Sequence, residues 1–204
     1  ADWSDYRRFL KAALDRYGER ITHISVSGEV DGLNQFFGTK LEFRAAYIYF
    51  GMLEQFGDLP IITKVLNVDD EELFSARRPR TEVVDFILDD LDMAISMMDP
   101  GGEVGPNRVH KDVARLFKAR VCLYEGTWEK YHSGTVFAGS TDGTAYLQEA
   151  ATTAKALIDE ANYSLSTGSG DPTQAYYELF VEMDLTGNPE VLLWRDYDAL
   201  GLGV

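Results

Sequence analysis

Apolar residues recur every three or four positions along four long stretches of the chain. This spacing places apolar side chains on one face of an α-helix and polar side chains on the other. The pattern predicts four main helices: Lys40–Phe56, Thr81–Met98, Lys111–Lys130 and Ala145–Ala161. Aromatic and aliphatic residues surround almost every side of Lys40–Phe56, so we expect that helix to be buried all round.

Weaker patterns occupy the rest of the chain. We interpret them as a helix at Ser4–Tyr17, irregular structure at Gly18–Gly38, an extended run at Leu59–Asp70, a short helix at Tyr176–Met183 and a strand or extended segment at Glu190–Tyr197. The predicted fold class is therefore all-α and mainly helical. We expect antiparallel helix pairs like those of tetratricopeptide (TPR) repeats, with long loops and minor extended segments.

Several residues have predicted structural roles. Thr81 is a candidate N-cap, and the single cysteine, Cys122, lies in an apolar stretch that favours a buried, unreactive thiol. We expect one continuous core that contains Tyr47, Phe50, Leu53, Leu91, Leu116, Val121 and Leu157. Three arginines beside apolar residues are expected to bind carboxylates or helix-end carbonyls: Arg44, Arg108 and Arg120.

Composition narrows the class of partner. The 204 residues are 45% hydrophobic and 26% charged, as in globular proteins, and carry a formal net charge of -15. Such a charge argues against binding to nucleic acid or to an anionic membrane surface, because both favour clustered Lys and Arg. Neutral sugars, cations and basic proteins remain possible partners.

Catalytic and metal-binding patterns are scarce. The three histidines are far apart in the sequence, and neither an HExxH nor a CxxC motif is present. Asp89, Asp90 and Asp92 could supply paired carboxylates for glycoside hydrolysis, but they lie on the polar side of a predicted helix, which favours a solvated face. The acidic run Asp69–Glu72 is similarly expected to be a solvated loop. We expect no enzymatic activity, no cofactor and no metal site.

Three ring-bearing residues gather where a predicted helix meets a long loop. Aromatic faces at such a place can stack on the apolar C–H face of a sugar. Trp128 also lies on the apolar stripe, which favours core packing. Tyr131 and His132 are better candidates for exposure, and they are the predicted ligand-binding residues.

Four blocks of sequence resemble the SusD/RagB family of glycan-binding outer-membrane lipoproteins. Each block is weak alone, but together they cover most of Lys40–Tyr197 in the order that the family shows. The blocks are Glu42–Phe50 with Phe56–Pro60, Arg78–Ile87 with Asp90-Leu91, Asn107–Lys111 running into Ala119–Trp128, and Ala154-Lys155 to Leu165 followed by Tyr177–Phe180 and Glu190–Leu193.

The resemblance implies a surface-exposed lipoprotein of the outer membrane that captures oligosaccharides for a TonB-dependent transporter without catalysis. The family's mature proteins begin with a lipidated cysteine, whereas this chain begins with Ala1, so any lipid anchor to the membrane is absent from this chain. They are also usually more than twice as long. We therefore expect residues 1–204 to be the SusD-like N-terminal, TPR-containing region of a longer protein.

Two other functions remain open at this stage. A TPR-type adaptor would bind protein and no sugar, whereas a helical glycoside hydrolase would need an acid pair that the sequence does not clearly provide. The glycan and the residues that contact it are not specified by the resemblance.

Overall fold

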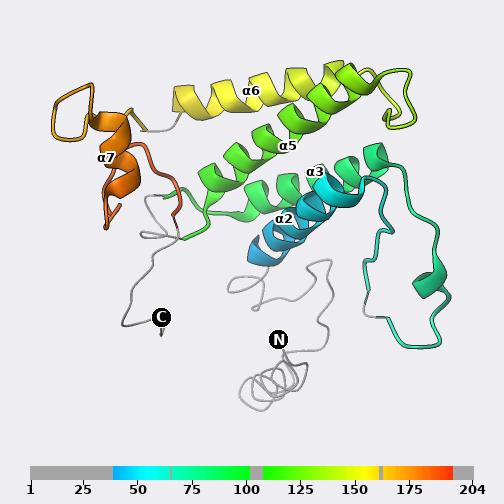
Figure 1. The fold of residues 1–204 in the computed structure, drawn as a ribbon. Helices are drawn as coiled ribbons and strands as arrows, with labels where there is room; N and C mark the ends of the chain where they lie inside the picture. Colours follow the sequence, from blue (N-terminus) through cyan, green and yellow to red (C-terminus); the bar gives the residue numbers. More distant parts are fainter. Residues whose placement is uncertain (1–38, 65, 102–107, 161–162, 195–204) are drawn as a thin grey trace, which may run out of the picture. The chain divides into compact units, whose positions relative to one another are not determined.

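A computed structural model describes residues 39–64, 66–101, 108–160 and 163–194 (Figure 1). The expected helix at Ser4–Tyr17 and the irregular segment Gly18–Gly38 lie outside the described residues. The chain divides into two compact units, Ala1–Met93 and Ala94–Val204.

Helices make up the regular structure of the described residues. They are α2 (Thr39–Phe56), the 3-10 helix η3 (Glu71–Phe74), α3 (Arg80–Met97), α5 (Lys111–His132), α6 (Thr144–Glu160) and α7 (Ala175–Val181). Within these residues there is no strand, and Leu59 and Arg78 form an isolated antiparallel bridge. The all-α prediction is confirmed, and the four main helices and the short helix agree with observed ones to within two residues at each end.

α2 is buried along one side only. Phe43, Ala46, Phe50 and Leu53 recur at helical spacing and are between 0% and 8% exposed. Tyr47, on the other side, is 61% exposed. The expectations that α2 is buried all round and that Tyr47 belongs to the core are therefore wrong, because one packing stripe is enough to hold the helix.

α3 packs beside α2 in the first unit (Figure 1). Tyr49 of α2 meets the ring of Phe86 on α3 edge-on, with 5.1 Å between the ring centroids. The buried stripe of α3 in this unit is fully enclosed and consists of Val83, Val84, Ile87 and Leu91. Burying aliphatic side chains of this size stabilises the pair by roughly 1.5–3 kcal/mol for each residue.

The loop between α2 and α3 begins with a tight turn, and its two ends are joined by backbone hydrogen bonds. Gly57 has a φ of 69° and donates its N–H to the Leu53 carbonyl at 2.9 Å, which ends α2. Leu59 and Arg78 then exchange backbone hydrogen bonds of 3.1 and 2.7 Å. These bonds close the base of the long loop that precedes α3.

A residue of the same turn caps α3. Asp58 Oδ1 accepts a 2.9 Å hydrogen bond from the N–H of Arg80, the first residue of the helix. Thr81 is buried inside the first turn, so the prediction that it is the N-cap is wrong. Asp58 supplies the capping oxygen from 22 positions upstream, which the local sequence around the helix start does not reveal.

α5 and α6 form an antiparallel pair in the second unit (Figure 1). Lys118 Nζ lies 2.7 Å from Glu149 Oε1, and Arg115 Nη1 lies 2.9 Å from Glu160 Oε2. The two helices approach closely at Gly126, where an added Cβ would lie 2.7 Å from Leu147 Cγ and 2.9 Å from the Leu147 backbone nitrogen. Gly126 therefore provides room for α6 that a larger residue would fill.

The segment after α6 folds back to the start of α5. Ser164 donates its backbone N–H to the Pro189 carbonyl at 3.1 Å. The ring of His110, the N-cap residue of α5, is buried and places Nε2 3.3 Å from the Leu192 carbonyl. The predicted strand or extended segment Glu190–Tyr197 is not a strand in its described part: Glu190 lies in a turn, the chain bends at Leu192, and residues 195–197 lie outside the described residues.

The remaining core predictions divide into correct and incorrect ones. Phe50, Leu53, Leu91, Val121 and Leu157 are buried, as is the Cys122 thiol, but Leu116 is exposed. Leu116 is 47% exposed although it lies one turn from the buried Val113 of the same helix, so the covered stripe of α5 ends between them.

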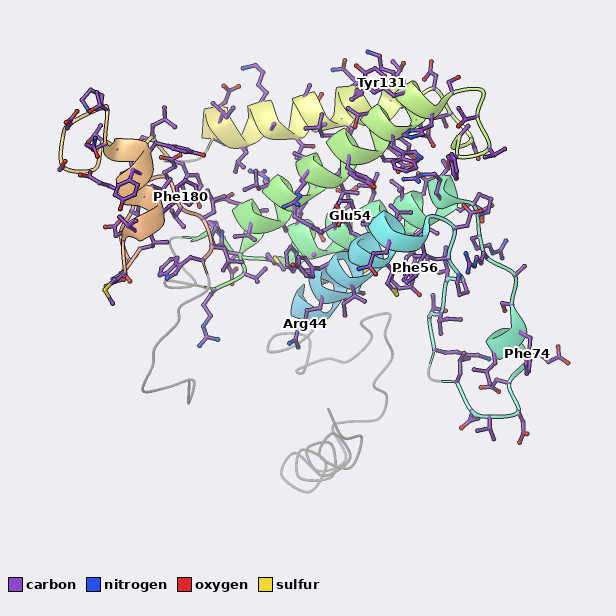
Figure 2. All side chains as sticks on the ribbon, in the orientation of Figure 1. Arg44, Glu54, Phe56, Phe74, Tyr131 and Phe180 are labelled. Atoms are coloured by element: carbon purple, nitrogen blue, oxygen red, sulfur yellow. The ribbon has the colours of Figure 1, made fainter. Side chains whose placement is uncertain are left out.

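The three arginines expected to have structural roles are all exposed. Arg44 points away from α2 in Figure 2, and Arg108 and Arg120 are exposed as well. No hydrogen bond or ion pair to any of them is present within the described residues, so the structural interpretation is wrong. Arg80 is the buried arginine of this part of the chain.

Candidate functional site

Three rings follow one face of the carboxyl-terminal half of α5. Tyr124, Trp128 and His132 are four residues apart and therefore lie above one another along the helix. The rings of Tyr124 and Trp128 are stacked with centroids 6.1 Å apart, and those of Trp128 and His132 with centroids 4.0 Å apart. We call these three residues the aromatic stack.

The loop after α5 fixes the orientation of the stack. Trp128 Nε1 donates a 2.9 Å hydrogen bond to the Phe137 carbonyl. His132 Nδ1 lies 2.9 Å from the Trp128 carbonyl, a contact that requires the proton on Nδ1. The hydroxyl of Thr135 donates to the His132 carbonyl at 2.7 Å. The rings of Trp128 and His132 are thus each held by a hydrogen bond to a main-chain carbonyl as well as by stacking.

A buried carboxylate holds the far part of the same loop. Glu129 of α5 is fully buried and accepts a hydrogen bond from the Thr141 hydroxyl. Gly139 lies directly against the Glu129 carboxylate, with no room for a Cβ, and Gly143, at a φ of 76°, lies against the backbone of Gly126. The loop therefore closes over the end of α5 at positions that only glycine can occupy without a shift.

A shallow depression of about 480 Å³ opens between the end of α5 and the start of α6. Asp142 caps α6 by accepting the N–H of Thr144 at 2.9 Å, and its hydrogen bonds with Thr144 hold the pKa of the carboxyl below its usual value. All but one of its lining residues carry a polar or charged side chain; the lining consists of Lys130, Ser133, Asp142, Thr144, Leu147 and Gln148.

The predicted ligand-binding residues differ in exposure. Tyr131 is 74% exposed and points outward in Figure 2, with Lys130 Nζ 5.5 Å from its ring centroid. His132 is half-buried because its ring stacks on Trp128. The prediction that both are more exposed than Trp128 therefore holds for Tyr131 only, since Trp128 is also half-buried and not in the core.

Comparison with known proteins adds to this picture through structure alone. No protein-family model and no curated protein matches this chain. A SusD-like protein from Bacteroides fragilis NCTC 9343 aligns with a TM-score of 0.62 and 22% identity, over 82% of this chain and 28% of that one. The chain has a SusD-like fold. The family resemblance seen in the sequence is thus confirmed at the level of the fold.

A second solved structure also aligns with the fold of this chain. It is a crystal structure with a xylogluco-oligosaccharide, and it aligns with a TM-score of 0.60 and 21% identity over 86% of this chain and 32% of that one. This chain therefore spans about a third or less of the length of either neighbour.

The SusD-like fold of this chain contains a carboxylate pair that the sequence analysis missed. Glu42 of α2 is 2% exposed, both its Oε atoms lack a hydrogen-bond partner, and burial raises its pKa. Burial, followed by the charges of Glu42 and Asp89, raises the pKa of Asp90 on α3 to about 6. The solvated-face interpretation is therefore wrong for Asp90. The available signal was the position of Glu42, four residues before the buried Ala46.

The described residues contain no cluster of side chains suited to bind a metal ion. In that part of the chain, no three His, Cys, Asp or Glu side chains lie close enough together to hold a metal ion. The acidic residues Asp69–Glu72 line a second shallow depression with Ser75 and lie at the surface, as predicted for a solvated run. Nor does any helix of these residues combine the length and apolarity needed to cross a bilayer.

Proposed function

We propose that this chain belongs to a cell-surface glycan-binding component of a SusC/SusD-type nutrient uptake system. The protein captures oligosaccharides and passes them to a TonB-dependent transporter of the outer membrane, and it performs no chemistry on them. The observation that carries the proposal is the SusD-like fold, shared with a neighbour solved with a xylogluco-oligosaccharide.

The end of α5 is the proposed sugar-contacting surface within this chain. The exposed ring of Tyr131 offers an apolar face to the C–H groups of a sugar, and the next residue, His132, presents a half-buried ring stacked on Trp128. The polar side chains of the adjacent depression, such as Ser133 and Gln148, can bind sugar hydroxyls. A platform of this kind suits a neutral ligand, so its affinity should change little with salt.

The proposal includes the position of the chain in a longer protein. Residues 1–204 are its N-terminal helical region, and the longer protein attaches to the cell surface through a lipid anchor. Because the neighbours are about three times as long, a sugar site of their kind can draw on residues with no counterpart here. We therefore expect weak binding by residues 1–204 alone and tighter binding by the longer protein.

Calorimetry with a panel of neutral oligosaccharides, starting with xylogluco-oligosaccharides, tests the proposal on both lengths. Tyr131→Ala should weaken binding about tenfold, as expected for the loss of about 1.4 kcal/mol of stacking. His132→Ala should have a smaller effect, because its ring is half-buried. Phe180→Ala is the matched control, since that ring is 70% exposed and lies on α7. Incubation with each sugar should release no reducing ends.

The adaptor function remains the alternative. It is favoured by the antiparallel α5–α6 pair and by exposed apolar side chains outside the aromatic stack. If neither length binds any glycan of the panel, the glycan proposal fails and the adaptor proposal gains support. If binding is seen but Tyr131→Ala leaves it unchanged, glycan binding stands and only the proposed surface is wrong.

A further inference from the structure

The loop between α2 and α3 has a defined shape although little of it is buried. Its base is closed by the hydrogen bonds between Leu59 and Arg78. A little further along, the backbone N–H of Ile62 donates to the hydroxyl of Tyr49 on α2 at 2.8 Å. Figure 1 shows the loop leaving the two helices and carrying η3 at a distance from them.

The far end of the loop is held by its own hydrogen bonds. The N–H of Asn67 donates to Asp70 Oδ2 at 2.7 Å, and the N–H of Leu73 donates to the Asp70 carbonyl at 3.1 Å. Lys64 forms an ion pair with Glu72 across the loop. The apolar side chains at this end are therefore presented on a structured turn.

Apolar side chains at this end are strongly exposed. Phe74 is 87% exposed, Val68 86% and Leu73 50%, and η3 has no buried residue. Figure 2 shows Phe74 at the outer side of the loop. Large apolar side chains grouped on a protruding element are typical of interaction sites. We call Val68, Leu73 and Phe74 the Phe74 tip.

The charge around the tip restricts what can cover it. Four consecutive carboxylates, Asp69–Glu72, lie between Val68 and Leu73, whereas the loop has three cations: Lys64, which pairs with Glu72, and Arg77 and Arg78 toward its base. This excess of negative charge repels nucleic acid and anionic lipid, and a neutral sugar gains nothing from it. A basic surface is the complement that lowers the electrostatic energy on contact.

We propose that the Phe74 tip is a docking element for another protein, which receives Phe74 in an apolar pocket rimmed by Lys and Arg. Aromatic side chains buried in such pockets dominate the affinity of small interfaces, and the surrounding charges increase the association rate. A single loop covers little area, so the complex is transient. The inference does not depend on glycan binding at α5.

Photo-crosslinking in the cells that make the protein tests the proposal. Phe74 is replaced by the photoreactive analogue benzoyl-phenylalanine, and the crosslinked peptides are identified by mass spectrometry. Phe180, replaced in the same way, is the control. The expected result is a crosslink from position 74, and not from position 180, to a Lys- or Arg-rich apolar surface of a different protein.

Binding to that protein, once purified, provides the second measurement. Phe74→Ala should weaken it about tenfold or more, and Asp69→Asn combined with Glu71→Gln should weaken it and reduce its dependence on salt. Both changes are at exposed positions, so the fold is retained. Crosslinks to this chain itself, to a second copy or to no protein would overturn the proposal, as would an affinity that the charge variants leave unchanged.

Discussion

The carboxylates of Glu42, which is buried, and Asp90, which is half-buried, make stability depend on pH in a direction opposite to that of most acidic residues. The folded pKa of Asp90 is about 6, against an ordinary value of 3.8. The folded state therefore binds the Asp90 proton more tightly than the unfolded state does. Its contribution is fully present below about pH 4, decreases as the pH rises, and is lost once the pH passes about 6.

The size of the effect follows from the shift. About two pKa units correspond to about 3 kcal/mol at most, and contact of the half-buried Asp90 with water reduces this to about 1–2 kcal/mol. Glu42 adds to the effect in the same direction, because burial also raises its pKa. Asp90→Asn removes one charge of the pair and should raise the free energy of unfolding by about 1–2 kcal/mol at pH 8.

Urea titrations of the wild-type chain and of Asp90→Asn between pH 4 and pH 8 measure this directly. Asp89→Asn is the matched control, because it neutralises an exposed carboxylate at the preceding position of the same helix and should change stability by less than about 0.5 kcal/mol. A loss of stability in Asp90→Asn at pH 8 would refute the reasoning, since it would mean that the Asp90 charge has a favourable partner in the folded state.

Two further predictions concern packing, and both use denaturant titration. Phe50→Ala removes a buried ring of α2 and should lower the free energy of unfolding by about 3–5 kcal/mol. Tyr47→Ala, at an exposed position of the same helix, should lower it by less than about 1 kcal/mol. Similar losses of stability in the two variants would contradict the burial of α2 on one side. Gly51→Ala meets nothing within 4 Å and should stabilise by about 0.5–1 kcal/mol. Gly126→Ala should destabilise despite the same gain in helix propensity, because its Cβ would press on the α6 backbone; stabilisation by both would place the helices further apart than described.

The helices could be predicted from the sequence because apolar periodicity reports local structure. Which side of a helix is covered was harder to predict. Tyr47 and Leu116 fit the apolar pattern but are exposed, since hydrophobicity does not say how many neighbours a helix has. The cap of α3 was missed because Asp58 is distant in sequence and reaches the helix only through the bridge between Leu59 and Arg78.

The candidate site was predicted in part. The contact between Trp128 and His132 followed from their four-residue spacing at the end of α5, whereas the part of Tyr124 in the same stack was missed. The hold of Glu129 on the loop depends on the path of residues 133–143, which periodicity does not specify. Sugar contact by Tyr131 and His132 stays a prediction.

The contact between His110 and Leu192 has a consequence for the order of folding. It closes a chain segment of 82 residues, whereas α5 and α6 are joined by a loop of only 11 residues, Ser133–Gly143. Closing the longer segment costs more chain entropy, so the α5–α6 hairpin should form first and the turn around Leu192 should dock afterwards. In pulsed hydrogen exchange during refolding, the amides of α5 and α6 should gain protection before those of residues 163–194.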